Sequence, residues 1–219
     1  MLRSVSIFSD ILPIIFFILF TKRNKKEGLW VIFLYSILSF VADNSFNRLP
    51  QVVDFYVYSS FTIIEYTLFT FFLYKALKEK LFKYILITGS VVFYAIAIFN
   101  LFKEKKETFD SLAASVECIL AIIYIICFLY EQIKDPANSF IYYSKKFWIV
   151  IAFFLYFSST LFLFVYADNF TNEEHKNYWN INFIFNILKN AALSLAFVMK
   201  KRERTAYSLE NPYSDLYNE

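Results

Sequence analysis

The sequence predicts an all-α integral membrane protein, a bundle of seven transmembrane helices. Three observations predict this class. Of the 219 residues, 58% are hydrophobic and 22% aromatic, whereas a soluble domain has about 45–50% apolar residues, and the mean hydropathy is +0.47. The apolar residues form runs of about 20, the length of a helix that crosses a ~30 Å hydrocarbon layer. Two glycines and four prolines are too few for the turns of a β-barrel, whose strands also alternate polar and apolar residues.

The apolar runs follow one another with brief connections, so consecutive helices are expected to be antiparallel neighbours. The runs are 5–20, 29–42, 55–77, 81–101, 112–130, 147–166 and 178–199. The first is kept as a helix and not as a cleaved signal peptide, because only Arg3 precedes it and a basic cluster follows it. Residues 1–204 then form one transmembrane domain. Residues 205–219 are polar and acidic without apolar periodicity, which predicts a short mobile tail.

Basic residues are distributed unevenly between the two sets of connections. Fifteen lysines and arginines lie in the first, third and fifth connections and the tail, and six lie in the N-terminus and the other connections. Because such residues are retained on the cytoplasmic side, this predicts an outer N-terminus and a cytoplasmic tail. The Phe-, Ile-, Lys- and Asn-rich composition is typical of an AT-rich bacterial genome, which makes the inner membrane the expected location.

Three tryptophans lie close to predicted helix ends: Trp30, Trp148 and Trp179. Amphipathic rings gather at the two membrane–water interfaces, where one part of the ring meets lipid and another meets water. These positions favour a role as interfacial anchors over a role in ligand contact.

Four ionisable side chains lie inside the predicted spans: Asp10, Glu65, Glu117 and Lys189, on the first, third, fifth and seventh runs. Such groups cost several kcal/mol unless they are paired or hydrated, so each is a candidate for function. At 1.5 Å per residue, Asp10 and Glu117 lie roughly 10–12 Å below the outer surface and Glu65 and Lys189 lie deeper. The two deeper groups are therefore expected to form an ion pair.

The last helix carries a polar stripe that includes Lys189. Asn182, Asn186 and Lys189 have the spacing i, i+4, i+7, which places them on one face, and Asn190 and Ser194 extend it. This face is expected to point into the bundle and to line a polar pocket in its outer half, with the acids named above. Either some of these acids are protonated, or the cavity is wet and favours cations and hydrogen-bond donors. A purely structural ion pair is the alternative.

A seven-helix chain with an outer N-terminus, a lysine on the last helix and a glutamate on the third is similar to retinal-binding rhodopsins. The resemblance implies a Schiff base on Lys189. The microbial type has an acid one turn before this lysine, where this chain has Phe185, and a mid-membrane tryptophan on the sixth helix, where Trp148 lies at the cytoplasmic end. Retinal on Lys189 is therefore kept only as an alternative, and no other cofactor is predicted.

The residues indicate no enzyme, metal centre or nucleic-acid partner. One histidine and two cysteines, Cys118 and Cys127, supply few metal ligands, and no nucleotide loop or serine triad is present. We expect a membrane sensor or receptor-like module that signals through a separate partner at its basic inner face. A small-solute or proton-coupled transporter and a structural subunit of a membrane complex are the alternatives. A pocket lined by the named residues favours the sensor, and a continuous polar path across the whole bundle favours the transporter. A bundle with no cavity and a large exposed apolar groove favours the subunit.

Overall fold

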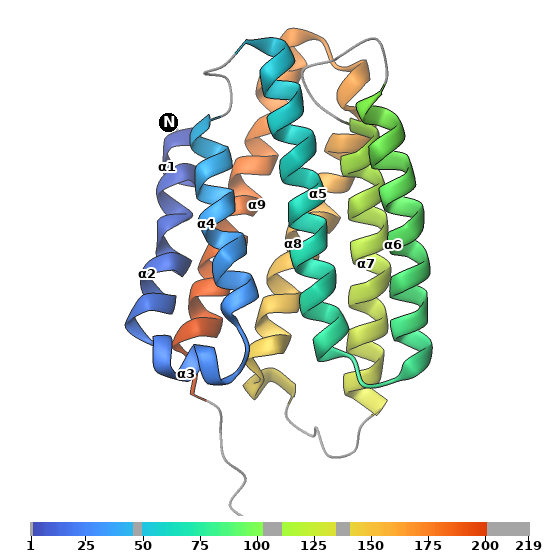
Figure 1. The fold of residues 1–219 in the computed structure, drawn as a ribbon. Helices are drawn as coiled ribbons and strands as arrows, with labels where there is room; N and C mark the ends of the chain where they lie inside the picture. Colours follow the sequence, from blue (N-terminus) through green and yellow to red (C-terminus); the bar gives the residue numbers. More distant parts are fainter. Residues whose placement is uncertain (1, 46–49, 103–110, 135–140, 201–219) are drawn as a thin grey trace, which may run out of the picture.

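The computed structural model describes residues 2–45, 50–102, 111–134 and 141–200, and within these ranges the chain is helical, with no strand. The predicted tail at 205–219 lies outside the described residues. Two short 3₁₀ turns, η2 (Ile141–Tyr143) and η3 (Ala167–Asn169), precede and follow α8. The α-helices are α1 (Leu2–Ser9), α2 (Ile11–Leu19), α3 (Thr21–Lys26), α4 (Trp30–Ser45), α5 (Gln51–Ala76), α6 (Lys80–Leu101), α7 (Ser111–Lys134), α8 (Lys145–Tyr166) and α9 (Asn172–Val198) (Figure 1).

Five helical segments are long and apolar enough to cross a membrane: Leu2–Leu19, which joins α1 and α2, then α6, α7, α8 and most of α9. The predicted all-helical membrane class is therefore confirmed by length and composition. Helix α4 is apolar but has only 16 residues. Helix α5 has 26 residues, but its Asp54, Glu65 and several hydroxyl side chains lower its hydropathy.

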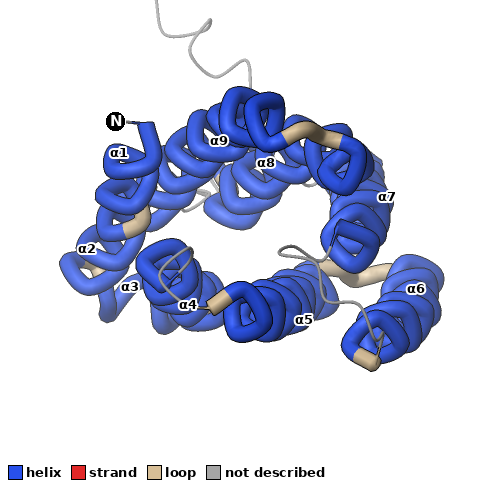
Figure 2. The backbone as a smooth tube through the Cα atoms, turned by 90° about the horizontal axis from the view of Figure 1, so that it is seen from above, coloured by secondary structure: helices blue, strands red, loops and turns tan. Residues whose placement is uncertain are grey.

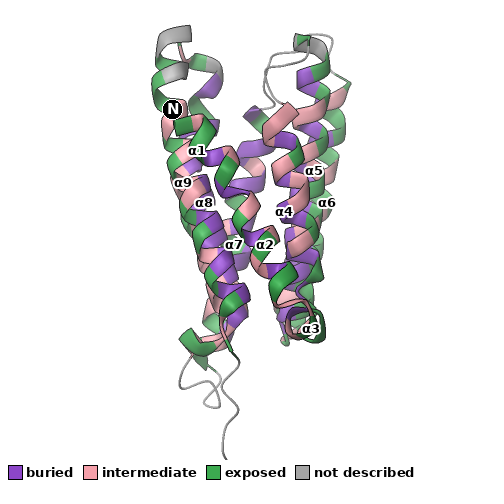
Figure 3. Ribbon diagram, turned by 90° about the vertical axis from the view of Figure 1, so that its left-hand side faces the viewer, coloured by how far each residue is buried: buried purple, intermediate pink, exposed green. Residues whose placement is uncertain are grey.

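The helices form a ring with one helix outside it. Viewed along the bundle, α1 with α2, α4, α5, α7, α8 and α9 surround a common interior, and α6 packs on the outside against α5 and α7 (Figure 2). Buried residues lie between the helices and exposed residues lie on their outer faces (Figure 3). Large apolar side chains such as Phe8, Val91, Phe99 and Phe162 are exposed. Lipid, and not water, is the solvent that suits this surface.

The first predicted run is divided at Asp10, between α1 and α2. Proline has no backbone N–H and its ring clashes with the carbonyl four residues earlier, so Pro13 disturbs the helix at Ser9. The Ser9 hydroxyl donates to the Ser6 carbonyl oxygen at 2.6 Å, which adds a second partner to that carbonyl. The break brings Asp10 to the inner side of the bundle, where it is buried.

The last helix begins earlier than the apolar run predicted, at Asn172 and not at 178. Thr171 and Glu174 form a capping box: the Thr171 hydroxyl accepts from the Glu174 N–H at 3.4 Å, and the Glu174 carboxylate accepts from the Thr171 N–H at 3.0 Å. Hydrogen bonds from the Thr171 backbone and hydroxyl hold the pKa of Glu174 below its ordinary value. Polar capping, which hydropathy does not register, sets this boundary.

Glu131 of α7 stabilises the short connection between α5 and α6. Its buried carboxylate accepts from the backbone N–H of Lys78 at 2.8 Å and from that of Glu79 at 2.8 Å. These amides lie at the start of α6, where helix N–H groups take partners from outside the helix and a negative charge is favourable. The carboxylate thus anchors α7 to the connection.

Gly89 of α6 packs directly against side chains of α7, those of Tyr124 and Leu120. A Cβ atom at this position would collide with the hydroxyl of Tyr124, which donates to the Leu86 carbonyl oxygen at 3.2 Å and lies 3.1 Å from the hydroxyl of Tyr66. The Gly89→Ala protein is expected to lose about 1–3 kcal/mol of the free energy of unfolding, because overpacking displaces this hydroxyl. Thermal unfolding in detergent measures the loss.

The control is the same substitution in a Tyr124→Phe background, where the clashing oxygen is gone. There Gly89→Ala should cost much less, although the ring carbon that carried the oxygen still lies 3.1 Å from the new Cβ. In an unconstrained helix, alanine is more stable than glycine by about 1 kcal/mol. A Gly89→Ala protein that is more stable than the wild type would therefore contradict the close packing of α6 on Tyr124.

Candidate functional site

The polar stripe of α9 meets α1 and α4 inside the bundle. The side-chain amide of Asn186 donates to Ser6 Oγ at 2.9 Å, to Asp10 Oδ1 at 3.1 Å and to Asp43 Oδ2 at 3.2 Å. The amide of Asn190 donates to the same Asp10 oxygen at 2.6 Å. Two of the predicted site residues, Asp10 and Asn186, are therefore in direct contact. One amide holds two carboxyl groups from different helices close to each other.

Lys189 and Glu65, the predicted ion pair, are joined through a third side chain. The Lys189 ammonium donates to the Tyr35 hydroxyl, and that hydroxyl donates to Glu65 Oε1 at 2.9 Å. Lys189 is only 2% exposed, and its nitrogen lies 5.0 Å from the centre of the Tyr35 ring and 4.2 Å from that of Tyr156. Cation–π attraction to two rings adds to the hydrogen bond.

Glu117 of α7 and Asn182 of α9 take no part in either cluster. Glu117 is 3% exposed, and its Oε1 atom has no hydrogen-bond partner. The side-chain oxygen of Asn182 is also buried without a partner. Buried polar atoms in folded proteins nearly always have a partner, so each of these oxygens requires an explanation.

A partly open cavity of about 80 Å³ connects these groups. On the same measure, one water needs only about 10–15 Å³. We call this cavity the acid pocket. It lies towards the end of the bundle that holds the N-terminus, because Arg3 in the first turn of α1 and Trp179 and Asn182 in the N-terminal half of α9 form part of its wall. Its polar and charged lining residues are Arg3, Ser6, Asp43, Thr62, Glu65, Glu117 and Asn182.

The rest of the acid pocket is largely aromatic. The aromatic lining residues are Tyr58, Phe61, Tyr156, Phe157, Phe164, Trp179 and Phe183. Trp179, for which the sequence favours an anchoring role, thus lies in the pocket wall, with its ring centre 6.3 Å from that of Phe164. Tyr156 is shared with the Lys189 cluster, whereas Lys189 itself does not line the cavity.

Two residues of the site were missed by the sequence prediction. Asp43 was assigned to a connection, because the second apolar run ends at residue 42, but α4 continues to Ser45 and carries Asp43 into the pocket wall. Tyr35 stands in the second apolar run, and the sequence prediction did not single it out. The spacing of Tyr35, Ser39 and Asp43 is i, i+4, i+8, a polar face that the sequence does contain.

A group of tightly packed rings lies next to the acid pocket in the interior of the bundle. Phe69 and Phe153 lie with ring centres 4.4 Å apart, Tyr35 and Phe153 4.9 Å apart, and Phe17 and Phe197 5.2 Å apart. All five side chains are buried. We call this group the aromatic plug. The aromatic plug lies directly against the acid pocket, because the ring centre of the pocket-wall residue Phe157 lies 5.6 Å from that of Phe69 and 5.8 Å from that of Phe153.

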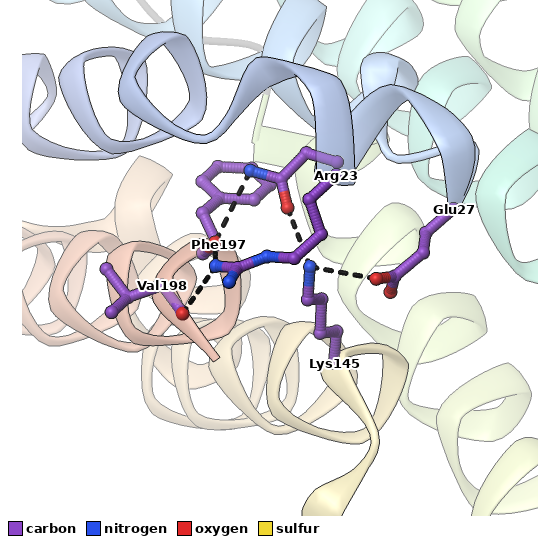
Figure 4. A network of polar contacts seen from close by, with 6 residues as sticks. Arg23, Glu27, Lys145, Phe197 and Val198 are labelled. Atoms are coloured by element: carbon purple, nitrogen blue, oxygen red, sulfur yellow. Dashed lines mark hydrogen bonds and ion pairs between the residues drawn. The ribbon is translucent and has the colours of Figure 1, made fainter. Parts of the chain in front are cut away.

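A second polar network closes the opposite end of the bundle (Figure 4). Arg23 of α3 donates to the carbonyl oxygens of Phe197 at 3.0 Å and Val198 at 2.5 Å, and the Asn24 amide donates to the Phe197 oxygen at 3.3 Å. The last carbonyls of a helix have no partner within it and attract cations. Helix α3 therefore caps the C-terminal end of α9.

The same network fixes the start of α8 through a buried lysine. Lys145, whose side chain is 2% exposed, donates to Asn24 Oδ1 at 2.8 Å and lies 3.0 Å from the Glu27 carboxylate (Figure 4). The sequence prediction counted Lys145 only among the basic residues of a connection. The structure places it in a buried ion pair between α8 and the segment that follows α3.

The site does not fit the retinal alternative. Lys189 is engaged by Tyr35 and does not line the acid pocket, and about 80 Å³ is far below the ~300–1,000 Å³ of pockets for drug-sized ligands. Within the described ranges, no group of three or more His, Cys, Asp or Glu side chains is arranged to hold a metal ion. The pocket wall presents carboxyl groups, hydroxyl groups, an amide, aromatic rings and the guanidinium group of Arg3.

Fold and site together define an all-helical protein with five helices suited to cross a membrane and an acid-lined pocket at one end. Comparisons with protein-family models, with curated proteins and with solved structures found no match.

Proposed function

We propose that this chain is a sensor or receptor-like module of the bacterial inner membrane, with seven transmembrane helices, an outer N-terminus and a cytoplasmic C-terminus. A small solute enters the acid pocket from outside, and the chain signals through a separate protein at its basic inner face. The acid pocket carries this proposal: it is partly open, ends on buried side chains and presents unpartnered oxygens of Glu117 and Asn182.

The helix count treats α1 and α2 as one span and adds α4 and α5 to the other four. Helix α5 is long enough, and its polar residues Asp54, Thr62, Glu65 and Thr70 are all buried, so its low hydropathy comes from its interior face. At 1.5 Å per residue, α4 is about 24 Å long, which a locally thinner bilayer accommodates. Both helices belong to the ring around the common interior.

The aromatic plug favours a sensor over the transporter alternative. A carrier requires a polar route that continues past the binding site. Here the buried side chains beyond Lys189 are mainly packed rings and aliphatic groups, and the hydroxyls of Ser36 and Ser194 among them donate to carbonyl oxygens of their own helices. The polar network at the opposite end ties α3 to α9, and α3 presents Lys22, Lys25 and Lys26 as exposed cations. This arrangement supports docking of a partner at the inner face.

Cysteine labelling in whole cells tests the proposal. In a Cys118→Ala/Cys127→Ala background, Asn182→Cys is expected to react with a membrane-impermeant thiol reagent added outside, because residue 182 lines the acid pocket. Lys25→Cys, exposed on α3, should react only after permeabilisation. Ser194→Cys, buried between the acid pocket and the inner end, should stay protected in both conditions.

Labelling of Lys25→Cys in intact cells would reverse the orientation and refute the proposal. Tyr178→Cys, an exposed position on α9, serves as the positive control for labelling from outside. If Tyr178→Cys reacts and Asn182→Cys stays protected, the pocket is closed to the outside. Labelling of Ser194→Cys from outside would reveal a route through the aromatic plug and would support the transporter.

A further inference from the structure

The outer half of the bundle carries more negative than positive groups. The acid pocket and the side chains immediately behind it hold four carboxyl groups and two cations: Asp10, Asp43, Glu65 and Glu117 against Arg3 and Lys189. Lys189 is directed to Tyr35 and is separated from the cavity. Clefts of one sign with low-dielectric walls concentrate ions of the opposite sign, so this cavity attracts cations.

The buried side-chain atoms of the pocket that have no hydrogen-bond partner are acceptors. They are Glu117 Oε1 and the Asn182 side-chain oxygen, on α7 and α9. Glu117 is almost completely buried, so water from the open surface is not its ordinary partner. An unsatisfied buried carboxylate oxygen costs more than a neutral one, and a ligand that supplies N–H donors removes that cost.

The aromatic part of the wall suits a positively charged nitrogen. Cations within about 6 Å of a ring centre are attracted to its face, most strongly when they are removed from water. The bundle already contains one example of this chemistry, the Lys189 ammonium above the Tyr156 ring at 4.2 Å. Besides Tyr156, the acid pocket is lined by six further aromatic side chains, so its wall presents the same ring chemistry to a cation.

We propose that the acid pocket binds a small primary ammonium ion, the protonated form of an amine, which donates N–H groups to Glu117 Oε1 and to the Asn182 oxygen. This inference rests on the proposed outward-open pocket and names the chemical class of its solute. An ammonium group donates hydrogen bonds to both acceptors, and its positive charge balances part of the excess negative charge of the carboxyl groups. Unlike a metal ion, it needs no cluster of chelating side chains, and the described residues form none.

Ligand-induced thermal stabilisation of the purified full-length protein in detergent tests this proposal. Ethylammonium chloride is expected to raise the unfolding temperature saturably, because a ligand that binds only the folded state stabilises it. Sodium chloride at the same ionic strength, acetamide and sodium acetate should not. Tetramethylammonium, which has no N–H, should bind at least about tenfold more weakly, the loss expected for a missing charge-assisted hydrogen bond.

Two pocket variants and one matched control locate the effect. Glu117→Gln and Asn182→Ala should each raise the apparent Kd for ethylammonium about tenfold or more. Glu131→Gln, the same change at a buried acid that only anchors the α5–α6 connection, should leave it unchanged. Equal binding by Glu117→Gln would overturn the assignment of this carboxylate to the ligand.

The remaining outcomes separate this inference from the proposed function. Stabilisation by acetamide or acetate, with none by ethylammonium, would overturn the ammonium proposal and leave an outward-open solute pocket in place. The same conclusion would follow if ethylammonium had no effect on the unfolding temperature although the Asn182→Cys variant is labelled from outside. Equal stabilisation by tetramethylammonium would refute N–H donation. A labelling pattern that contradicts the outward-open pocket would instead count against the proposed function.

Discussion

Replacing Lys189 with methionine is expected to lower the free energy of unfolding by about 3–5 kcal/mol, the usual cost of breaking a buried pair from one side. Lys189, Tyr35 and Glu65 form a chain of hydrogen bonds in the centre of the bundle. Without the ammonium group, the Glu65 carboxylate keeps only the Tyr35 hydroxyl as a partner. Thermal unfolding in detergent, compared with the wild type, measures the loss.

Further variants measure the separate contributions of Glu65 and Tyr35 to this hydrogen-bonded group. Glu65→Gln should cost less than Lys189→Met, because an amide still accepts from Tyr35. Tyr35→Phe should cost about 1–3 kcal/mol through the lost hydroxyl alone. The double variant Lys189→Met/Glu65→Leu should recover much of the loss, since both charges are gone. If the effects of the two single substitutions at 189 and 65 simply add, the residues are not coupled.

The second large effect is expected at the opposite end of the bundle, where Glu27→Ala leaves the Lys145 ammonium with Asn24 as its remaining hydrogen-bond partner. Because Lys145 is buried, its uncompensated charge should lower the free energy of unfolding by about 3–5 kcal/mol. Lys145→Met should cost less, because the Glu27 side chain is 24% exposed and can be hydrated once the lysine is gone. The unfolding temperatures of the two variants in detergent show which substitution destabilises the protein more.

An exposed ion pair of the same kind provides the control. Lys134 and Glu79 lie 3.5 Å apart with side chains 62% and 39% exposed, so Glu79→Ala should change stability by only about 0–1 kcal/mol. The double variant Glu27→Ala/Lys145→Met should be more stable than Glu27→Ala alone. Equal losses for Glu27→Ala and Glu79→Ala would mean that Lys145 reaches water and is not held in a buried pair.

Hydropathy and helical spacing determined which segments are helices and which face of α9 is polar. The run predicted at 81–101 differs from α6 by one residue at its start, and the run at 147–166 differs from α8 by two. The spacing of Asn186 and Lys189 placed both side chains in the interior, where both are buried. Signals of this kind are local, because the length and periodicity of an apolar run depend only on neighbouring residues.

Helix ends were predicted less well where polar residues continue a helix. Asp43 lies beyond the second apolar run and yet inside α4, and Asn172 begins α9 six residues before the predicted start. Hydropathy falls at such residues whether the helix stops or continues. Capping bonds and buried partners, such as the amide of Asn186 for Asp43, decide between these outcomes.

The partners of the charged groups were decided by tertiary structure alone. The sequence contains Lys189 and Glu65 at compatible depths, but only the packing of α4 beside α5 places the Tyr35 hydroxyl between the two side chains. Likewise, Lys145 and Glu131 stand at helix ends, where a sequence reader places charges in water, and packing against neighbouring segments buries both. A hydrogen bond between helices depends on their order around the ring and on the rotation of each about its axis. Neither quantity is encoded in the one-dimensional pattern of any single helix.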